Sequence, residues 1–267
     1  MTQFMRNRMG KEYAYMRSTK ANLPLKLEGT KNTRELGGYP TAAGGNTAGG
    51  QFLRSDDPSR LTEADIKRLY DYGVRLVIDF RSESEAEQAP SPLIGYLDIE
   101  YINPQMLDNI HVRPEPGEKD EIDLPSTLGD MYIGFLENKK DVYLDIIKTV
   151  LRHMDDCIFF NCTAGKDRAG TFAMILLKLA GVPDEVVVAD YKISGDLVKE
   201  EMDLIVENLK TKGIEFDEDM IRSRPVHMQK VLEHLDTAYG SIEKWLDVIG
   251  LSGDEIAQLR SKVIGDY

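Results

Sequence analysis

Cysteine is scarce in this chain, with only Cys157 and Cys162 among 267 residues. If both lie on one extended run, their Cα atoms are about 16 Å apart at ~3.3 Å per residue. A disulfide requires less than about 7 Å, so the two cannot pair. Free cysteines indicate a reducing compartment and exclude a disulfide-stabilised scaffold.

Long hydrophobic runs are also missing. No stretch of about 18 apolar residues is present to cross a membrane, and no apolar signal region opens the chain. The sequence therefore predicts no stable membrane insertion. We expect a cytoplasmic protein, or one exported without a classical signal peptide.

Positive charge is in the minority, because 33 Lys and Arg stand against 46 Asp and Glu, for a net charge of −13. An acidic protein is a poor partner for nucleic acid or an anionic membrane.

The length suffices for one large domain with a substantial core. Residues 1–30 are polar and basic and read as an N-terminal arm, which leaves residues 31–267 as a single domain.

Short β-rich segments alternate with helical patterns in the first two thirds of the chain. Strands are predicted at residues 74–80, 97–102 and 157–161. Strands separated by helices indicate an α/β fold with a central, mainly parallel sheet flanked by helices, followed by a helical C-terminal part. The expected helices after residue 127 are 128–137, 139–154, 169–181, 183–191, 194–212, 225–239, 241–249 and 252–264.

The most informative segment joins the strand at 157–161 to the helix that begins near 169. It starts with Cys162 and ends with Arg168, with small residues between them. The free N–H groups of a helix N-terminus and of a tight loop form a nest for an anion. Arg168 adds a planar fork for two phosphate oxygens, and this field favours the thiolate of Cys162. The pattern therefore predicts covalent phosphoryl transfer through a cysteine. The predicted phosphate-binding residues are Thr163, Ala164, Gly165, Lys166, Asp167, Arg168 and Arg54.

The loop resembles that of the protein tyrosine phosphatase superfamily. It is most similar to the bacterial tyrosine/dual-specificity phosphatase family typified by mycobacterial protein tyrosine phosphatase B. That family's loop reads His-Cys-x-Ala-Gly-Lys-Asp-Arg-Thr-Gly, and this chain reads Asn-Cys-Thr-Ala-Gly-Lys-Asp-Arg-Ala-Gly at 161–170. Further family blocks match at residues 32–39, 52–55, 79–82, 188–191 and 239–241.

This resemblance implies a phosphatase that works through a phosphocysteine intermediate, without a metal or other cofactor. The implied substrates are phosphotyrosine proteins, with phosphoserine/threonine or phosphoinositides as extensions, and inorganic phosphate should bind the loop. The four histidines show no metal-ligand spacing. The alternatives are a catalytically weakened phospho-binding homologue, an inositol-phosphate hydrolase, and a rhodanese-like sulfurtransferase.

Two positions depart from the family pattern. Asn161 stands where the family has a histidine that orders the loop and favours the thiolate. Ala169 stands where the superfamily has a hydroxyl that helps the thiolate leave the intermediate, and Thr171 lies two residues further on. These departures motivate the weakened-homologue alternative.

Ester cleavage also needs a carboxyl group that gives a proton to the leaving oxygen and then activates water. Asp79, at the carboxyl end of its predicted strand, is the first choice and matches the family's candidate acid. Its alternative role is a strand-end carboxylate bonded to loop amides or to an arginine. Asp167, inside the loop, is the second candidate for the acid, or it organises the cradle. Asp56 and Asp57 are weaker candidates.

Several basic side chains fall in the matching blocks. Lys166 would bring a second positive charge near the phosphate. Arg34, Arg54 and Arg81 could each bind substrate or brace a carboxylate, and bracing is favoured for two of the three.

Overall fold

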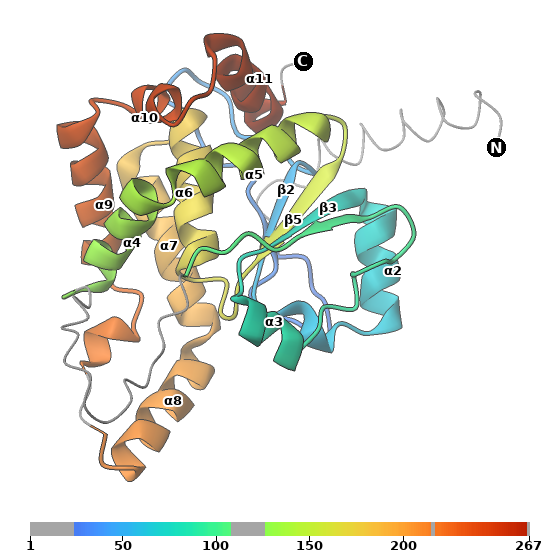
Figure 1. The fold of residues 1–267 in the computed structure, drawn as a ribbon, viewed down its shortest axis with the longest axis vertical. Helices are drawn as coiled ribbons and strands as arrows, with labels where there is room; N and C mark the ends of the chain where they lie inside the picture. The colour runs from blue at the N-terminus through green and yellow to red at the C-terminus, as the bar shows by residue number, and fades with distance from the viewer. Residues whose placement is uncertain (1–23, 108–125, 215–216, 266–267) are drawn as a thin grey trace.

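The computed structural model describes residues 24–107, 126–214 and 217–265. A five-stranded sheet has the order β1-β2-β5-β3-β4 (Figure 1). All neighbouring strands are parallel except β1 and β2, which confirms the predicted α/β class. The strands are β1 (Arg34–Glu35), β2 (Phe52–Ser55), β3 (Val74–Asp79), β4 (Glu100–Ile102) and β5 (Cys157–Asn161).

Helices cover both faces of the sheet. They are α2 (Glu63–Tyr72), α3 (Glu83–Gln88), α4 (Leu128–Asn138), α5 (Lys140–Arg152), α6 (Arg168–Leu179), α7 (Asp184–Leu197), α8 (Lys199–Thr211), α9 (Pro225–Ala238), α10 (Ile242–Val248) and α11 (Gly253–Ile264). Helix α2 packs on one face, the larger helical layer covers the other, and α8 projects away from the sheet (Figure 1). Within the described residues, no helix has both the length and the apolar character needed to cross a membrane.

Strand periodicity divides the buried side chains between two cores. Successive residues of a strand point to opposite faces, so Ile78 and Phe160 join the large cluster under the helical layer. Their neighbours Val77 and Phe159 join the smaller cluster under α2. Both faces are apolar because both are covered, as is usual for a parallel sheet.

Local signals fix most element ends. Thr62 forms a capping box with Asp65 at the start of α2, and Gly73 ends that helix with a φ of 108°, as left-handed C-caps commonly do. Helix α6 ends just before Gly181, whose φ is 76°. The helix predicted at 169–181 is therefore confirmed.

Two predicted boundaries were wrong. The strand expected at 97–102 begins only at Glu100, because Leu97 has a φ of 50°, which no strand allows. The helix break expected at 192–193 lies instead at Val198. Helix α7 continues through Gly195, where an added Cβ would come within 2.9 Å of Ser223. That glycine serves close packing and does not end the helix.

The structure describes only the last residues of the predicted arm, 24–30. Residues 1–23 lie outside the described residues. From residue 24 the chain packs on the domain: the Leu25 amide donates to the Thr33 carbonyl at 3.1 Å, and Leu27 is buried. The amide of Glu28 also donates to Asp65 at 2.9 Å.

The sheet register determines where chemistry is possible. Ser55 and Asp79 both pair with Asn161, so β2, β5 and β3 end at the same level. Ligands of parallel sheets bind beyond these carboxyl ends. The loop that begins at Cys162 leaves from the middle of this edge.

Candidate active site

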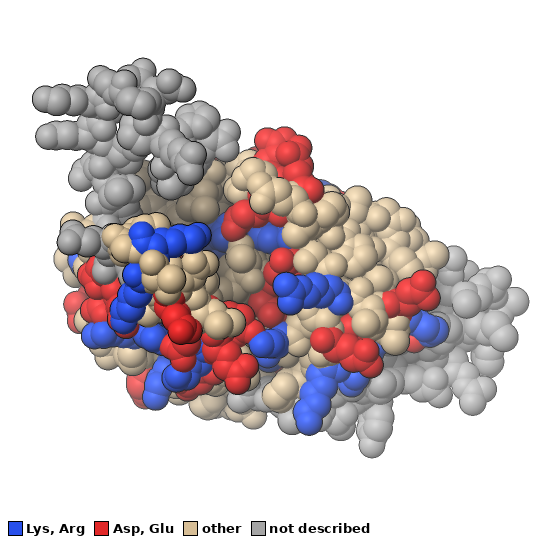
Figure 2. All heavy atoms as spheres, turned by 90° about the horizontal axis from the view of Figure 1, so that it is seen from below, with Lys and Arg blue, Asp and Glu red and all other residues tan. Residues whose placement is uncertain are grey.

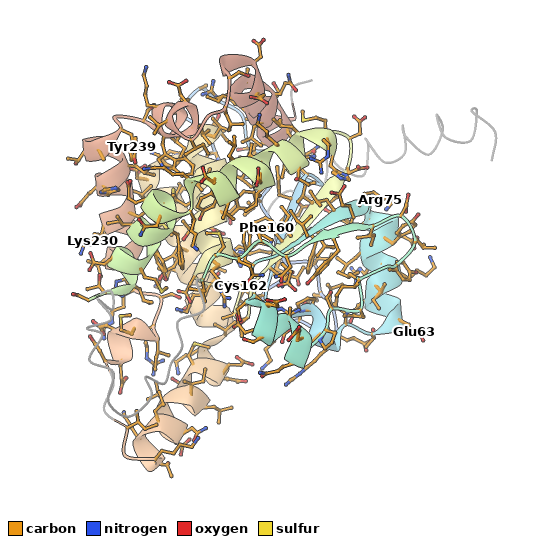
Figure 3. All side chains as sticks on the ribbon, viewed as in Figure 1. Glu63, Arg75, Phe160, Cys162, Lys230 and Tyr239 are labelled. Atoms are coloured by element: carbon orange, nitrogen blue, oxygen red, sulfur yellow. The ribbon has the colours of Figure 1, made fainter. Side chains whose placement is uncertain are left out.

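Cys162 is the first residue after β5, and Arg168 is the first residue of α6. Figure 3 shows Cys162 just beyond Phe160. The residue is only 1% exposed and belongs to the large apolar cluster under the helical layer. The loop is thus the strand-to-helix turn that the sequence predicts.

The backbone of this loop is anchored through four successive carbonyl groups. The backbone amide of Asp57 donates to the Thr163 carbonyl at 3.1 Å. Asn32 Nδ2 donates to the Ala164 carbonyl at 2.9 Å. Arg54 donates from Nε to the Gly165 carbonyl at 2.8 Å and from Nη2 to the Lys166 carbonyl at 3.1 Å. The peptide bonds of the described residues are trans, so each following N–H group points away from its anchored carbonyl. These N–H groups are therefore turned to the opposite side of the loop, as an anion nest requires.

Gly165 is required for this shape. Its φ is 65°, a conformation that costs glycine little. A Cβ at this position would lie 2.5 Å from the carbonyl oxygen of Ser55 and 2.7 Å from Asn32 Nδ2. The backbone of the loop can approach β2 only because this residue has no side chain.

Arg168 is held in place by a carboxylate that the sequence reasoning missed. Its Nη1 lies 2.6 Å from Glu85 Oε2 and donates to the Phe80 carbonyl at 3.0 Å. Its Nη2 donates to Glu85 Oε1 at 3.2 Å and to the Thr163 hydroxyl at 3.0 Å. Burial opposes the charge of Arg168, but interactions with Cys162 and Glu85 raise its pKa above the ordinary value.

Glu85 lies on α3 and serves two purposes. Its Oε2 accepts from the Ser82 amide at 2.7 Å and closes a capping box. Burial would raise the pKa of Glu85, but bonding to Arg168 outweighs burial and lowers it to about 2. The available signal was Ser82-x-x-Glu85 directly after the 79–82 block, because this spacing is that of a capping box.

Glu85→Gln is expected to remove a pH-dependent part of the stability. The pKa of Glu85 falls on folding, from 4.5 to about 2. The ion pair therefore stabilises the fold fully above about pH 4.5, and this contribution is lost as the pH falls towards 2. Because the Glu85 side chain is 33% exposed, the difference at pH 7 should be on the order of 1–2 kcal/mol. Urea unfolding of both proteins between pH 7 and pH 2 measures it.

Glu137→Gln is the matched control. Burial would also raise the pKa of Glu137, but bonds from Lys140, His234 and Tyr239 lower it to about 2. Glu137→Gln should show a similar pH dependence of stability and leave turnover unchanged. Glu85→Gln should also reduce turnover, because Arg168 loses its partner. A Glu85→Gln stability difference that stays constant down to pH 2 would contradict the ion-pair role.

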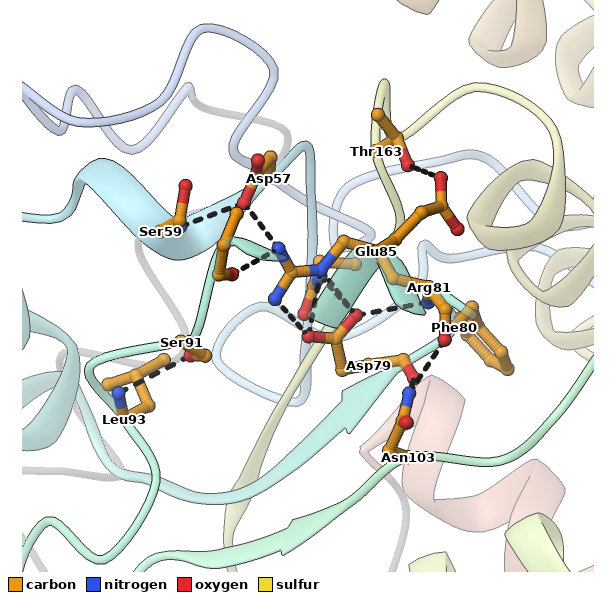
Figure 4. A network of polar contacts seen from close by, with 12 residues as sticks. Asp57, Ser59, Asp79, Phe80, Arg81, Glu85, Ser91, Leu93, Asn103 and Thr163 are labelled. Carbon is orange, nitrogen blue, oxygen red and sulfur yellow. Dashed lines mark hydrogen bonds and ion pairs between the residues drawn. The ribbon is translucent and has the colours of Figure 1, made fainter. Parts of the chain in front are cut away.

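Asp79, the first choice for the acid, is completely buried in a network of donors (Figure 4). Arg81 donates from Nε to Oδ1 and Oδ2 at 3.0 Å and from Nη2 to Oδ2 at 2.6 Å. Tyr101 and Asn161 each donate at 2.9 Å. This is the alternative role named above, a strand-end carboxylate bonded to an arginine.

Asp167, the second candidate, is 23% exposed and lies on the loop itself. Its Oδ1 accepts from Lys166 Nζ at 2.7 Å and from the Tyr132 hydroxyl. Tyr132 is bonded in turn to Tyr191 at 2.8 Å. Lys166 is itself buried, so its charge is paired with Asp167. The structure thus gives Asp167 a fixed position with access to solvent, next to Arg168.

The three arginines of the matching blocks all brace carboxylates. Arg81 pairs with Asp79, and Arg34 and Arg54 both pair with Asp190. The guanidinium of Arg54, predicted to bind phosphate, is 0% exposed. It contacts the loop from the carbonyl side, where Nε and Nη2 donate to the carbonyls of Gly165 and Lys166.

Asp56 and Asp57 hold turns. Asp56 accepts from the Asn32 amide at 3.0 Å. Asp57 accepts from the Ser59 amide at 2.9 Å and pairs with Arg81 at 2.8 Å. Neither carboxylate is bonded to the Cys162 loop in these contacts.

The two departures from the family pattern are both part of this packing. Asn161 donates to Asp79 at 2.9 Å, so it links the end of β5 to the end of β3. Ala169 is buried in the first turn of α6. The Thr171 hydroxyl donates its proton to the Asp167 backbone carbonyl at 3.1 Å, so this proton is used in a hydrogen bond within the helix.

In the part of the chain that the structure describes, no three His, Cys, Asp or Glu side chains are grouped so that they could hold a metal ion. His111 lies outside that part. Metal-independent catalysis stays a prediction.

Comparison with known proteins identifies the family. A sequence model described as the tyrosine phosphatase family matches residues 25–265. The chain therefore belongs to the tyrosine phosphatase family, whose members are phosphate-ester hydrolases. It is 31% identical over 219 residues to a tyrosine-protein phosphatase of Nostoc commune, a match that covers 79% of this chain and 74% of the relative.

Two further relatives are more distant. A putative tyrosine-protein phosphatase of Cupriavidus necator is 24% identical over 88% of this chain and 86% of its own length. The triple specificity protein phosphatase PtpB of Mycobacterium tuberculosis is 24% identical over 90% of this chain and 98% of its own length. These long alignments confirm the resemblance seen in the sequence blocks.

Proposed function

We propose that this protein is a cysteine-dependent protein tyrosine phosphatase that acts through a phosphocysteine intermediate. The observation that carries the proposal is the loop between β5 and α6. Its carbonyl groups are anchored from behind, so the N–H groups that follow them point away from those anchors. Such fixed donors stabilise the charge that develops on the transferring phosphoryl group.

The reaction has two displacements. The Cys162 thiolate attacks phosphorus in line, an S–P bond forms, and the bond from phosphorus to the leaving oxygen breaks. Asp167, as the carboxylic acid, gives its proton to that oxygen. Water then attacks the phosphocysteine while the Asp167 carboxylate takes one of its protons. The S–P bond breaks, and inorganic phosphate and the thiolate are regenerated.

We assign the acid to Asp167 because a proton donor must reach the leaving oxygen. Asp167 is on the loop and partly exposed. The carboxylate of Asp79 is fully buried and already accepts from Arg81, Tyr101 and Asn161. Its bonds are suited to holding the strand ends.

The substrate class is phosphotyrosine in a protein, with phosphoserine/threonine and phosphoinositides as extensions. One relative is named a triple specificity phosphatase. On the face seen in Figure 2, Lys and Arg alternate with Asp and Glu without a broad basic area. In this proposal the loop and Arg168 recognise the anion.

The direct test is to trap the intermediate. The protein is mixed with p-nitrophenyl phosphate or a phosphotyrosyl peptide in the presence of EDTA, quenched in acid and digested. We expect release of phosphate and one phosphoryl group on the peptide that contains Cys162. Loss of turnover in EDTA would contradict a metal-free mechanism. Binding of the peptide without phosphate release would identify a phospho-binding homologue, and thiosulfate turnover alone a sulfurtransferase.

A further inference from the structure

A buried ionic cluster lies behind the Cys162 loop, centred on Asp190 of α7. The Asp190 side chain is 2% exposed. Its Oδ1 accepts from Arg34 Nε at 3.1 Å, from Arg34 Nη2 at 3.0 Å and from the Tyr39 hydroxyl at 2.8 Å. Its Oδ2 lies 2.5 Å from Arg54 Nη1. Attraction to the two arginines outweighs burial and lowers the pKa of Asp190, so it remains a carboxylate.

Arg54 transmits the position of this carboxylate to the loop. One nitrogen of its guanidinium is bound to Asp190, and the other two donate to the carbonyls of Gly165 and Lys166. Because the guanidinium is a rigid plane, fixing one of its nitrogens orients the others. Gly170, in the first turn of α6, leaves space for the group, since an added Cβ would lie 2.8 Å from Arg54 Nη2.

Arg34 closes the cluster from the other side of Asp190. Its Nη2 donates to the Ser194 hydroxyl at 2.9 Å, and Ser194 Oγ lies 3.4 Å from the Gly165 carbonyl. Arg34 also donates to Asn32 Oδ1, and the amide nitrogen of Asn32 holds the Ala164 carbonyl. The carbonyls of Ala164, Gly165 and Lys166 are thus all linked to one carboxylate.

The cluster also carries charge. Two guanidinium groups and one carboxylate leave one net positive charge in a buried position, where electrostatic effects are strong. Burial and Arg34 lower the pKa of Arg54, and interactions with Asp190 and Cys162 oppose that change. Asn161, which precedes Cys162, is neutral and supplies no such charge.

We propose, on the basis of the function proposed above, that Asp190 is a positioning residue that holds Arg54 against the loop. Through Arg54 it turns the loop N–H groups and one buried positive charge toward Cys162. Asp190 itself does not touch the substrate. The thiolate is then stabilised from behind by Arg54 and from the helix side by Arg168.

Asp190→Asn tests this with a readout that does not need turnover. The rate at which iodoacetamide alkylates Cys162 is measured against pH, and the midpoint reports thiolate formation. If Asp190 were only a counter-charge and Arg54 did not move, its removal would add net positive charge and lower the midpoint. A positioning role predicts the reverse, a rise of about one pH unit, because Arg54 is released from the loop. An unchanged or lowered midpoint would overturn the proposal.

Arg54→Lys is the second variant and keeps the charge while removing the rigid fork. It should also raise the alkylation midpoint, and both variants should reduce kcat for p-nitrophenyl phosphate between about tenfold and 10²-fold. If the Asp190 variant does not fold, an unchanged midpoint in Arg54→Lys is the overturning result.

Lys262→Met controls for lost stability. The buried Lys262 donates to the carbonyls of His153, Met154 and Asp156, beyond the amino end of β5. It should lower stability and leave the alkylation midpoint unchanged.

The result separates this proposal from the proposed function. A shifted midpoint in a protein whose wild type hydrolyses no phosphate ester would remove the function and keep the role of Asp190. Normal phosphate-ester hydrolysis by the wild type, with no shift of the alkylation midpoint in the variants, would keep the proposed function and remove the role of Asp190.

Discussion

Cys162→Ser is expected to abolish turnover of p-nitrophenyl phosphate, with a loss of about 10⁴-fold or more in kcat. The serine hydroxyl remains protonated near neutral pH, so no anionic nucleophile faces the bound phosphate. The change is small in volume and the anchored carbonyls do not involve this side chain. The loop should therefore keep its shape, and the variant should still bind the phosphotyrosyl peptide.

Cys157→Ser is the matched control for this prediction. Cys157 is also a buried cysteine and lies at the opposite end of β5. Its replacement should lower stability with turnover retained. Full activity in Cys162→Ser, or equal loss in both serine variants, would rule out Cys162 as the nucleophile.

Asp167→Asn is expected to reduce kcat for a phosphotyrosyl peptide by about 10³-fold. The tyrosyl oxygen needs a proton as it leaves, and the amide cannot supply one. The loss should be much smaller for p-nitrophenyl phosphate, because p-nitrophenolate leaves without protonation. Steady-state rates with both substrates against pH provide the measurement, and the limb assigned to a protonated carboxyl should disappear.

Asp79→Asn is the comparison that decides between the two aspartates. Removing the charge from a buried pair should destabilise the fold by about 3 kcal/mol, since Arg81 would lose its principal partner. The ratio of rates for the two substrates should stay as in the wild type. If the substrate-dependent loss follows Asp79 and not Asp167, the acid has been assigned to the wrong residue.

Much of the fold could be predicted from sequence because its signals are local. The apolar run Cys157–Asn161 and the caps Thr62, Gly73 and Gly181 each act within a few residues. The α7 boundary could not be predicted in this way. The break was expected at 192–193, whereas α7 continues through Gly195, which packs against Ser223, a contact that no local pattern contains.

The candidate site shows the same division. The loop from Cys162 to Arg168 is contiguous, so its chemistry could be predicted from the sequence. The partner of Arg168 was missed, because Glu85 is 83 residues away and its local pattern is that of a helix cap.

The sequence by itself determined the family and predicted the nucleophile and the phosphate-binding loop, since these depend on residue types at fixed short spacings. Only the tertiary structure decided which carboxylate each arginine meets. Arg54 and Asp190 are separated by 136 positions, and many such pairings are possible among 33 basic and 46 acidic side chains. Folding of the sheet and α7 selects one of them, because a buried charge must have its partner within contact distance.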